Sequence, residues 1–530
     1  MKHDGIFKIA PRGMGAARGD ATVMGLKAYD LARMARLGLP VPPAFVLGTL
    51  HCRRSSSEQE RYRKNLTSLL EEQMRWLQSV TGLGFGDPRK PLLVSARSGA
   101  PVSMPGMMDT ILDIGLCDAT ARGLLRTTGN PRLVWDSYRR LIQGFAEIVF
   151  EVSPSPFAAA AEGLLLREQV DRVQELDHLS LAELTQHYLQ LFQDLSGRPF
   201  PQNPFEQLEL AVQAVFASWN SPRAVDYRRL TGLADDLCTA VTVQQMVFGN
   251  GGGMSGTVVG FTRDPDTGEK RLYFDFLFNS QGEDVVSGRS AGTDAERLFL
   301  ALPEIEQELH RISTTLEEEF GDAQEFEFTI QEGVLYLLQS RTAKRTPWAA
   351  LRIAVELVAE GVIDRNGALA RLAGLQLEEI RRQRLSVEKD EPLCQGQQAG
   401  SGVATGPLAF DIEAARRFAA GGRPAVLVRE EMATADIAAI ALSSGVLTVR
   451  GSRTSHAAVV ARQLGKACIT GCAPLQLDSA RGLASFGDRS LFEGEMITVD
   501  ANTGRVFAGA ATIVSDRPTE WLAEIATWAN

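Results

Sequence analysis

The sequence of 530 residues lacks several features that define large classes of proteins. It contains no apolar run of about 18 residues, so no membrane-spanning helix is expected. Its first residues, MKHDGIFKIAPRG, include no apolar core of the kind found in secretory signals. The six cysteines are dispersed, which indicates cytosolic thiols and not a disulfide framework. We therefore expect a cytoplasmic protein that does not enter a membrane.

An excess of positive charge is also lacking, because 65 acidic residues outnumber 55 basic ones and give a formal net charge of −10 at pH 7. Proteins that bind nucleic acid in general have a basic surface, so this class is not favoured. A small anionic ligand is still compatible, because it needs only a local cationic pocket. The apolar content of 44% and the charged content of 23% are ordinary for a globular protein. A chain of this length is expected to form about two to four domains.

The most informative stretch is residues 450–466, RGSRTSHAAVVARQLGK. A β-prone run precedes it, and small and hydroxyl-bearing residues lead into a predicted helix at 457–464. Thr454 or Ser455 would cap this helix, whose first turn has unpaired N–H groups that attract an anion. His456 lies at this position, where a phosphorylated imidazole would be held. A half-buried structural histidine is the alternative that a single residue leaves open.

A glycine-rich segment, NGGGMSG, is followed by β-branched residues at 257–262. The spacing of Gly251, Gly253 and Gly256 matches the dinucleotide fingerprint, and Asp275 lies about 20 residues further on. That fingerprint opens a helix, whereas a strand is expected here. The Gly-Lys-Ser/Thr ending of a Walker loop is missing as well. A flexible lid whose backbone N–H groups cover phosphates fits the pattern better.

Residues 325–341, EFEFTIQEGVLYLLQSR, predict a β-hairpin that turns at Glu332-Gly333. Strand alternation places two polar side chains on one face of each strand. They are Glu325 and Glu327 on the first strand, and Gln339 and Arg341 on the second. Adjacent carboxylates repel unless a cation lies between them, and Mg²⁺ binds few carboxylates together with phosphate oxygens. The hairpin therefore indicates a metal–nucleotide site, with a solvent-facing strand as the alternative.

Two cations occur near the ends of other predicted elements. Residues 24–47 indicate a helix, a proline-containing turn and a strand, with Lys27 near the helix start. A cation is disfavoured there unless it binds an anion. Arg97 follows a predicted buried strand at 92–95 and opens a predicted loop at 97–106, where α/β enzymes place binding groups. An exposed surface position is the alternative for both residues.

Taken together, these segments resemble the phosphoenolpyruvate-utilising enzymes, and above all the pyruvate phosphate dikinase family. The resemblance rests on TSHAAVVAR around His456, residues 91–116 around Arg97, the segment at Lys27, the glycine-rich segment and the hairpin. It covers residues 20 to about 525. It implies that His456 is the residue that becomes phosphorylated, and that the other segments bind ATP with Mg²⁺.

The resemblance also implies a set of site residues. Those that bind ATP and its phosphates would be Lys27, Arg97, Arg139, Gly251, Gly252, Gly253, Thr257, Glu325, Glu327, Gln339 and Arg341. The candidate Mg²⁺ ligands are Glu327, Gln339, Asp275 and Glu283. Thr454 and Ser455 are candidates for regulatory phosphorylation, with helix capping as the alternative.

The implied fold class is α/β (α+β) and multidomain. An ATP-grasp-like nucleotide-binding domain is expected at residues 1–345, with a helical insertion at about 119–245. A helical linker at 346–390 would join it to a swivelling β/α phosphohistidine domain at 391–512. A helical tail is expected at 513–530.

The implied activity is phosphotransfer, in which ATP and inorganic phosphate yield AMP, pyrophosphate and phosphohistidine. The family's barrel, which binds pyruvate and phosphoenolpyruvate, is expected to be absent from this chain. Three alternatives follow: a dikinase whose barrel is a separate chain, a phosphotransferase for another small-molecule or protein acceptor, and a catalytically idle nucleotide-binding or scaffold module. The expected partners are ATP, inorganic phosphate and that barrel chain, and a homodimer is left open.

Overall fold

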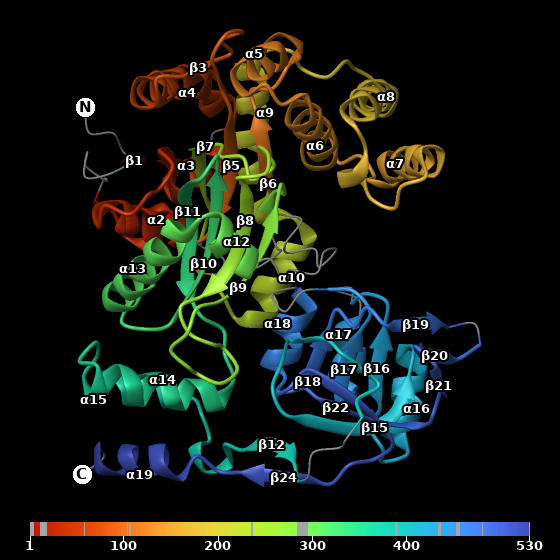
Figure 1. Cartoon of the computed structure of the whole chain (residues 1–530). Helices are drawn as coiled ribbons and strands as arrows, with labels where there is room; N and C mark the ends of the chain where they lie inside the picture. Colours follow the sequence, from red (N-terminus) through yellow and green to blue (C-terminus); the bar gives the residue numbers. More distant parts are fainter. Residues whose placement is uncertain are drawn as a thin grey trace. The chain divides into compact units, whose positions relative to one another are not determined.

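The computed structural model describes residues 5–10, 18–57, 59–102, 104, 108–234, 237–282, 295–386, 391–432, 436–451, 456–479 and 481–528 (Figure 1). They form two compact units. The first unit comprises Met1–Gly252 with Tyr336–Gln339, and the second comprises Gly253–Leu335 with Ser340–Asn530. Both units combine helices and sheets, which confirms the expected α/β class. The domain boundaries drawn from the sequence stay predictions.

Two expectations from composition can be compared with the described residues. All six cysteines are free thiols, as expected. Within the described part of the chain, no helix combines the length and the apolar character that crossing a bilayer requires.

The first unit is built on a five-stranded antiparallel sheet with the strand order β1-β2-β7-β5-β6. The strands are β1 (Ile6–Ile9), β2 (Ala44–Leu47), β5 (Val94–Gly99), β6 (Thr110–Ile114) and β7 (Ala240–Gln245). Side chains alternate between the two faces. One face carries apolar residues such as Phe45, Ala96 and Val243, which belong to the main hydrophobic core. The other face carries Arg97 and the buried residues Thr242 and Val46, so polar and apolar side chains are mixed there.

The first unit also contains ten α-helices among its described residues, and side chains of α4, α5, α6 and α9 contribute to the core on the apolar face. The ten helices are α1 (Ala21–Met24), α2 (Leu26–Arg36), α3 (Thr49–Ser57), α4 (Gln59–Thr81), α5 (Asp118–Thr128), α6 (Pro131–Val149), α7 (Ser155–Glu168), α8 (His178–Ser196), α9 (Pro204–Ala217) and α10 (Pro222–Thr231). The short strands β3 (Gly84–Phe85) and β4 (Pro91–Leu92) form a separate pair. Several helices begin with a side-chain cap, as Asn130 accepts the N–H of Leu133 at the start of α6. The region predicted to be helical is therefore helical from Asp118 to Thr231, and ends in strand β7.

The second unit contains a four-stranded antiparallel sheet with the order β11-β10-β8-β9. Its strands are β8 (Gly256–Phe261), β9 (Tyr273–Phe278), β10 (Gln324–Gln331) and β11 (Val334–Thr342), and α12 (Ala295–Ala301) and α13 (Pro303–Phe320) precede the hairpin. Glu332 and Gly333 have φ of 50° and 80°, so the predicted hairpin turn is confirmed. Strand β8 also excludes the dinucleotide fingerprint, which needs a helix after the glycines.

The predicted helical linker contains α14 (Pro347–Ala359) and α15 (Arg365–Leu372), but it then continues as strand β12 (Arg382–Leu385). The predicted helical tail likewise begins with strand β24 (Ile513–Asp516) before α19 (Thr519–Trp528). β12 and β24 pair in antiparallel register, which satisfies their backbone groups and overrides local helix preference. Residues 391–512 are thus connected through two paired strands, and α19 packs with α14 and α15 in one apolar cluster.

Residues 394–508 form an eight-stranded mixed sheet in the order β13-β23-β22-β15-β16-β17-β18-β14. Its parallel part, β15 to β18, is connected by α16, α17 and α18 (Figure 1). The elements are β13 (Cys394–Gln395), β14 (Gln397–Gln398), β15 (Val403–Ala409), α16 (Ile412–Ala420), β16 (Val426–Arg429), α17 (Ile437–Leu442), β17 (Gly445–Thr448), α18 (His456–Gln463), β18 (Ala467–Thr470), β22 (Met496–Asp500) and β23 (Arg505–Ala508). A three-stranded sheet of β19 (Leu475–Asp478), β20 (Leu483–Phe486) and β21 (Arg489–Phe492) completes this part.

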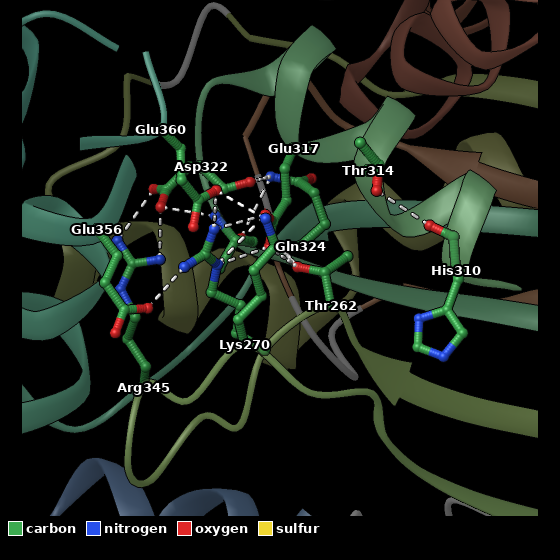
Figure 2. Close-up of polar contacts among 12 residues, drawn as sticks. Thr262, Lys270, His310, Thr314, Glu317, Asp322, Gln324, Arg345, Glu356 and Glu360 are labelled. Atoms are coloured by element: carbon green, nitrogen blue, oxygen red, sulfur yellow. Dashed lines mark hydrogen bonds and ion pairs between the residues drawn. The ribbon is translucent and has the colours of Figure 1, made fainter. Parts of the chain in front are cut away.

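A fully buried arginine joins α13 and α14 to the four-stranded sheet. Arg263, which follows β8, donates from Nη2 to Glu317 at 2.9 Å and to Glu360 at 2.8 Å, and from Nη1 to Glu356 at 2.9 Å. Thr262 adds a hydroxyl hydrogen bond to Glu317 at 2.7 Å. Figure 2 shows the three carboxylates gathered at one point. Because a buried charge needs a partner, this cluster fixes the start of the linker to the sheet.

Replacing Arg263 by methionine should therefore destabilise the protein. The substitution leaves Glu317 buried without its cation, so we expect a loss of about 3–5 kcal/mol in the free energy of unfolding. Thermal unfolding of both proteins measures this. Arg311→Ala is the matched control, because Arg311 pairs with Glu308 on the exposed face of α13 and its loss should cost below about 1 kcal/mol. Equal shifts for the two variants would contradict the assigned role.

Candidate functional site

The register of the second unit's sheet places several predicted residues on one face. Val259 in the middle strand β8 lies directly opposite Asp275 on β9 and Glu327 on β10. Residues opposite each other in antiparallel strands point to the same face, as do residues two positions apart. Glu325 and Thr257 therefore share this face. We call the side that carries Asp275, Glu325 and Glu327 the acidic face. Asp275 and Glu327 are separated by strand β8, so their Cα atoms are about 10 Å apart.

Glu325 on the acidic face forms an ion pair with Arg341 of the neighbouring strand β11. The contact joins Arg341 Nη2 to Glu325 Oε1. Glu325 is buried, and among the described residues its second oxygen, Oε2, has no hydrogen-bond partner. Burial lowers the pKa of Arg341, but the carboxylates of Glu325 and Glu327 outweigh burial and raise it. Arg341 therefore offsets part of the negative charge of Glu325 and Glu327, and a Mg²⁺ ion between the two carboxylates stays a prediction.

Lys344, which sequence reasoning missed, lies close to the same ion pair. Burial and the neighbouring Arg341 lower the pKa of its ammonium, whereas Glu325 raises it. The residue follows the end of β11, where the alternation that identified Arg341 no longer applies. No local pattern therefore distinguished Lys344 from a surface lysine.

Thr257 and the glycine-rich segment precede this face. The hydroxyl of Thr257 is buried and donates to the carbonyl of Ser280 at 3.0 Å, so it connects β8 to the end of β9. Gly252 has a φ of 129°, which favours glycine, and a Cβ at Gly252 or Gly253 would have no neighbour within 4 Å. Gly251 and Gly252 belong to the first unit, and Gly253 to the second. The segment thus has an open backbone, as a lid over phosphates requires.

Arg97 lies on the polar face of the first unit's sheet. The structure places it inside β5, opposite Thr242 on β7 and Thr110 on β6, so the prediction of a loop from residue 97 was wrong. Pairing with β7 holds β5 extended as far as Gly99, despite its glycine and serine residues, and β6 pairs with it as far as Arg97. The Nη1 of Arg97 lies 3.5 Å from the carbonyl oxygen of Leu338, the neighbour of buried Gln339.

Lys27 is brought to the same part of the first unit by a close contact between backbones. It is the second residue of α2, and the N–H of Leu26 donates to the carbonyl of Ala100 at 2.8 Å. Gly25 has a φ of 76°, and a Cβ there would lie 1.9 Å from the carbonyl oxygen of Gly99. Only glycine permits this approach. The exposed start of α2 is thereby fixed beside the end of β5, close to Arg97 in sequence.

Arg139 occupies a buried polar cluster in α6. Its Nη2 lies 2.5 Å from Oδ1 of Asp136, whose Oδ2 accepts from Arg140 at 3.1 Å and from Asn250 at 3.2 Å. Burial raises the pKa of Asp136, but the three nearby arginines outweigh it and hold the pKa well below its usual range. Asn250 immediately precedes Gly251. The cluster therefore anchors the base of the glycine-rich segment, and contact of Arg139 with a nucleotide stays a prediction.

His456 is the first residue of α18, the helix that follows parallel strand β17. The helix therefore begins on the side of the sheet where the parallel strands end, which is where α/β sheets bind ligands. Its first N–H groups and its dipole favour an anion at this position. The side chain of His456, together with Glu283, Thr454 and Ser455, lies outside the described residues.

Two family profiles match the chain. One is described as the AMP/ATP-binding domain of pyruvate phosphate dikinase and matches residues 62–297. The other is described as the mobile domain of the PEP-utilising enzymes and matches residues 421–504. The match at 421–504 contains His456, and the match at 62–297 contains Arg97, Arg139 and the glycine-rich segment.

Curated relatives extend the similarity over nearly the whole chain. Pyruvate, phosphate dikinase 2 of Zea mays is 39% identical over 503 residues, which cover 94% of this chain and 57% of the relative. The pyruvate, phosphate dikinase of Clostridium symbiosum is 38% identical over 512 residues, with 96% and 59% covered. That of Rhizobium meliloti (strain 1021) is 38% identical over 534 residues, with 98% and 60% covered. The chain thus spans a little over half the length of these relatives.

The buried carboxyl group of Asp30, on the helix that carries Lys27, should make the stability of the protein depend on pH. Burial raises the pKa of Asp30 on α2 to about 7, although Arg33 lowers it. The folded state therefore favours the protonated carboxyl, and its contribution to stability is complete below about pH 4 and is lost as the pH rises through about 7. Asparagine stays neutral at every pH, so Asp30→Asn should gain stability over the parent as the pH rises. The difference between the free energies of unfolding of variant and parent should be about 3 kcal/mol larger at pH 8 than at pH 5. Thermal unfolding at both pH values measures the difference, and a pH-independent effect would contradict the burial of a neutral Asp30.

Proposed function

The chain belongs to the pyruvate phosphate dikinase family, and on this premise we propose that it transfers a phosphoryl group from ATP to His456. The observation that best supports the proposal is the acidic face, where a buried carboxylate oxygen of Glu325 has no partner among the described residues and lies beside Glu327 and Arg341. Phosphoryl transfer needs positioning and neutralisation of charge more than it needs reactive protein groups. A surface that combines carboxylates with a guanidinium meets this need.

The same face fits Mg²⁺, which we propose as the cofactor. In the described part of the chain, no group of three or more His, Cys, Asp or Glu residues is placed to hold a metal ion. Mg²⁺ in nucleotide enzymes takes only one or two carboxylates and completes its shell with phosphate oxygens and water. Glu327 and the second oxygen of Glu325 are the proposed donors, and Asp275 and Gln339 stay predicted candidates. When bound, the ion would neutralise negative charge on the phosphates.

Other residues of the chain are proposed to hold the phosphates and the leaving group. Lys27 at the start of α2 and Arg97 in β5 would provide positive charge in the first unit. The open glycine backbone around Gly252 would donate N–H groups to phosphate oxygens. Arg139 would act through Asp136 and Asn250 by fixing this segment. Each residue thereby positions or neutralises the nucleotide.

The covalent step is proposed to occur at the imidazole of His456. The unprotonated ring nitrogen attacks the β-phosphorus of ATP, the bond from this phosphorus to the oxygen of AMP breaks, and the proton on the other ring nitrogen is lost to solvent. The β- and γ-phosphoryl groups are then both on the histidine. Inorganic phosphate next attacks the γ-phosphorus and the bond from it to the β–γ bridging oxygen breaks, so that AMP, pyrophosphate and phosphohistidine account for all four phosphorus atoms. An intermediate on histidine divides a difficult transfer into two easier ones. The N-terminus of α18 would stabilise the negative charge that the imidazole gains.

The acceptor is the finer part of the proposal. The descriptions of the two matched domains support ATP binding by one and a mobile role for the other, which we propose carries the phosphoryl group. We propose that pyruvate, or another small molecule or protein, accepts the group while bound to a separate polypeptide. The names of the relatives suggest pyruvate as the first acceptor to test.

The phosphorylation step predicts a covalent adduct. Incubation with Mg²⁺, phosphate and ATP labelled at the β-phosphate should give a protein adduct that is stable in base and labile in acid, because phosphohistidine has this stability. His456→Ala should abolish the adduct. His310→Ala is the matched control, because His310 is an exposed histidine on α13 and its loss should leave labelling unchanged. Absence of any adduct from the parent protein would favour a nucleotide-binding module without catalysis.

The acceptor step has its own test. Labelled protein, freed of nucleotide, is mixed with pyruvate alone and then with pyruvate and a candidate barrel chain. We expect the label to stay on the protein with pyruvate alone and to appear in phosphoenolpyruvate when the barrel chain is added. Discharge by pyruvate alone would contradict a separate acceptor chain. Retention of the label in both mixtures would contradict pyruvate as the acceptor.

A further inference from the structure

Helix α18, which begins at His456, is held by a buried arginine near its other end. Arg462 exposes 1% of its side chain. Its Nε lies 2.9 Å from Oδ1 of Asp266, and its Nη2 donates to the carbonyl of Ala399 at 3.1 Å. Ala399 belongs to the same part of the chain as α18, whereas Asp266 lies in the turn between β8 and β9. One guanidinium therefore joins α18 to the sheet that carries the acidic face.

Aromatic rings complete this contact. The guanidinium of Arg462 lies 5.8 Å from the ring centre of Phe261 and 6.0 Å from that of Tyr273. The hydroxyl of Tyr273 donates to the carbonyl of Gln398 at 2.9 Å. Phe261 lies opposite both Tyr273 and Glu325, so the two rings share the acidic face. Glu325 is directly beside Phe261, and Glu327 and Asp275 are two residues further along their strands. Arg462 thus contacts the end of the surface proposed to bind the nucleotide.

Asp266 is itself held firmly on the sheet's side of the contact. Its N–H donates to Oδ1 of Asp264 at 2.9 Å, and its carbonyl accepts from the hydroxyl of Thr346 at 2.8 Å. Thr346 caps α14, the helix that Arg263 joins to the sheet. Because both the turn and its support are fixed, the position of Asp266 defines where Arg462 can be accommodated.

We propose that the Arg462–Asp266 pair is a docking latch that places α18 against the nucleotide-binding sheet and so positions His456 for phosphorylation. The proposal rests on the function proposed above. Arg462 follows His456 by six residues, which is about 9 Å along a helix. A helix is stiff over this length, so fixing one end fixes the other. Arg462 acts through the position of His456 and is a positioning residue.

The physical character of the latch makes docking both specific and reversible. Burying two charges costs desolvation energy that their attraction roughly offsets, whereas a misplaced helix would leave both charges buried without partners. Separation returns both ions to water, so the latch opens more easily than an apolar contact of equal size. Lysine could not replace Arg462, because only the planar guanidinium reaches Asp266 and Ala399 at once and also covers two rings.

The proposal is tested by a substitution that places a second positive charge opposite Arg462. Asp266→Arg in the full chain should lower the initial rate of labelling from β-labelled ATP at least tenfold, while the Kd for ATP stays within twofold. Small-angle X-ray scattering should show a larger radius of gyration. Glu269→Arg is the matched control, because Glu269 lies in the same turn, is exposed and undergoes the same change in charge. It should change neither rate nor radius.

A reversed pair separates docking from general damage. Asp266→Arg combined with Arg462→Asp should recover part of the lost rate and reduce the radius, because the ion pair is restored while the contacts to Ala399 and the two rings are not. Loss of folding or of the nucleotide site would allow no recovery. If Asp266→Arg does not fold, Asp266→Asn takes its place. It removes the negative partner of Arg462, so a lower labelling rate and a larger radius are again expected. Parent-like rate and radius in the single variant would overturn the latch, as would an equal loss of ATP affinity. If the parent forms no adduct, the proposed function fails, and the radii of the same variants still decide on the latch.

Discussion

A charge removed from water must meet an opposite charge, and this constraint organises the described structure. Four arginines satisfy it, each with a carboxylate partner: Arg263 with Glu317, Arg341 with Glu325, Arg139 with Asp136, and Arg462 with Asp266. Such pairs add little net stability, because desolvation offsets attraction. They are costly to misplace, however, so they specify which segments must lie together.

Each of these pairs holds a segment with a distinct role. Arg263 secures α14, and Arg341 secures the acidic end of the hairpin. Asp136 links α6 to the start of the glycine-rich segment through Asn250. Arg462 secures the helix that carries His456. The apolar cores of the sheets provide stability, whereas the buried ion pairs determine the placement of the groups that handle phosphate.

Much of this arrangement could be predicted where the signal is local. Alternation and the Glu-Gly turn identified the hairpin, and β-branched residues after the glycines identified β8. The pairs between distant segments had no such signal, because Arg462 and Asp266 are 196 residues apart. The extension of β5 through Arg97 and the strand at Arg382–Leu385 were missed for the same reason, since pairing with distant strands decided both. The residue types of the site were visible in the sequence, and their grouping by face came only from register.

The paired strands β12 and β24 have a mechanical consequence. A part of a chain that is attached by one flexible segment can turn about any axis. Residues 391–512 are instead attached by two strands whose Arg382–Leu385 and Ile513–Asp516 backbones are hydrogen-bonded side by side. Such a ribbon bends readily across its thin dimension and resists shear in its own plane. A rotation of residues 391–512 should therefore be restricted to one direction, across the thin dimension of the ribbon. The orientation of the two strands would then determine where His456 can move.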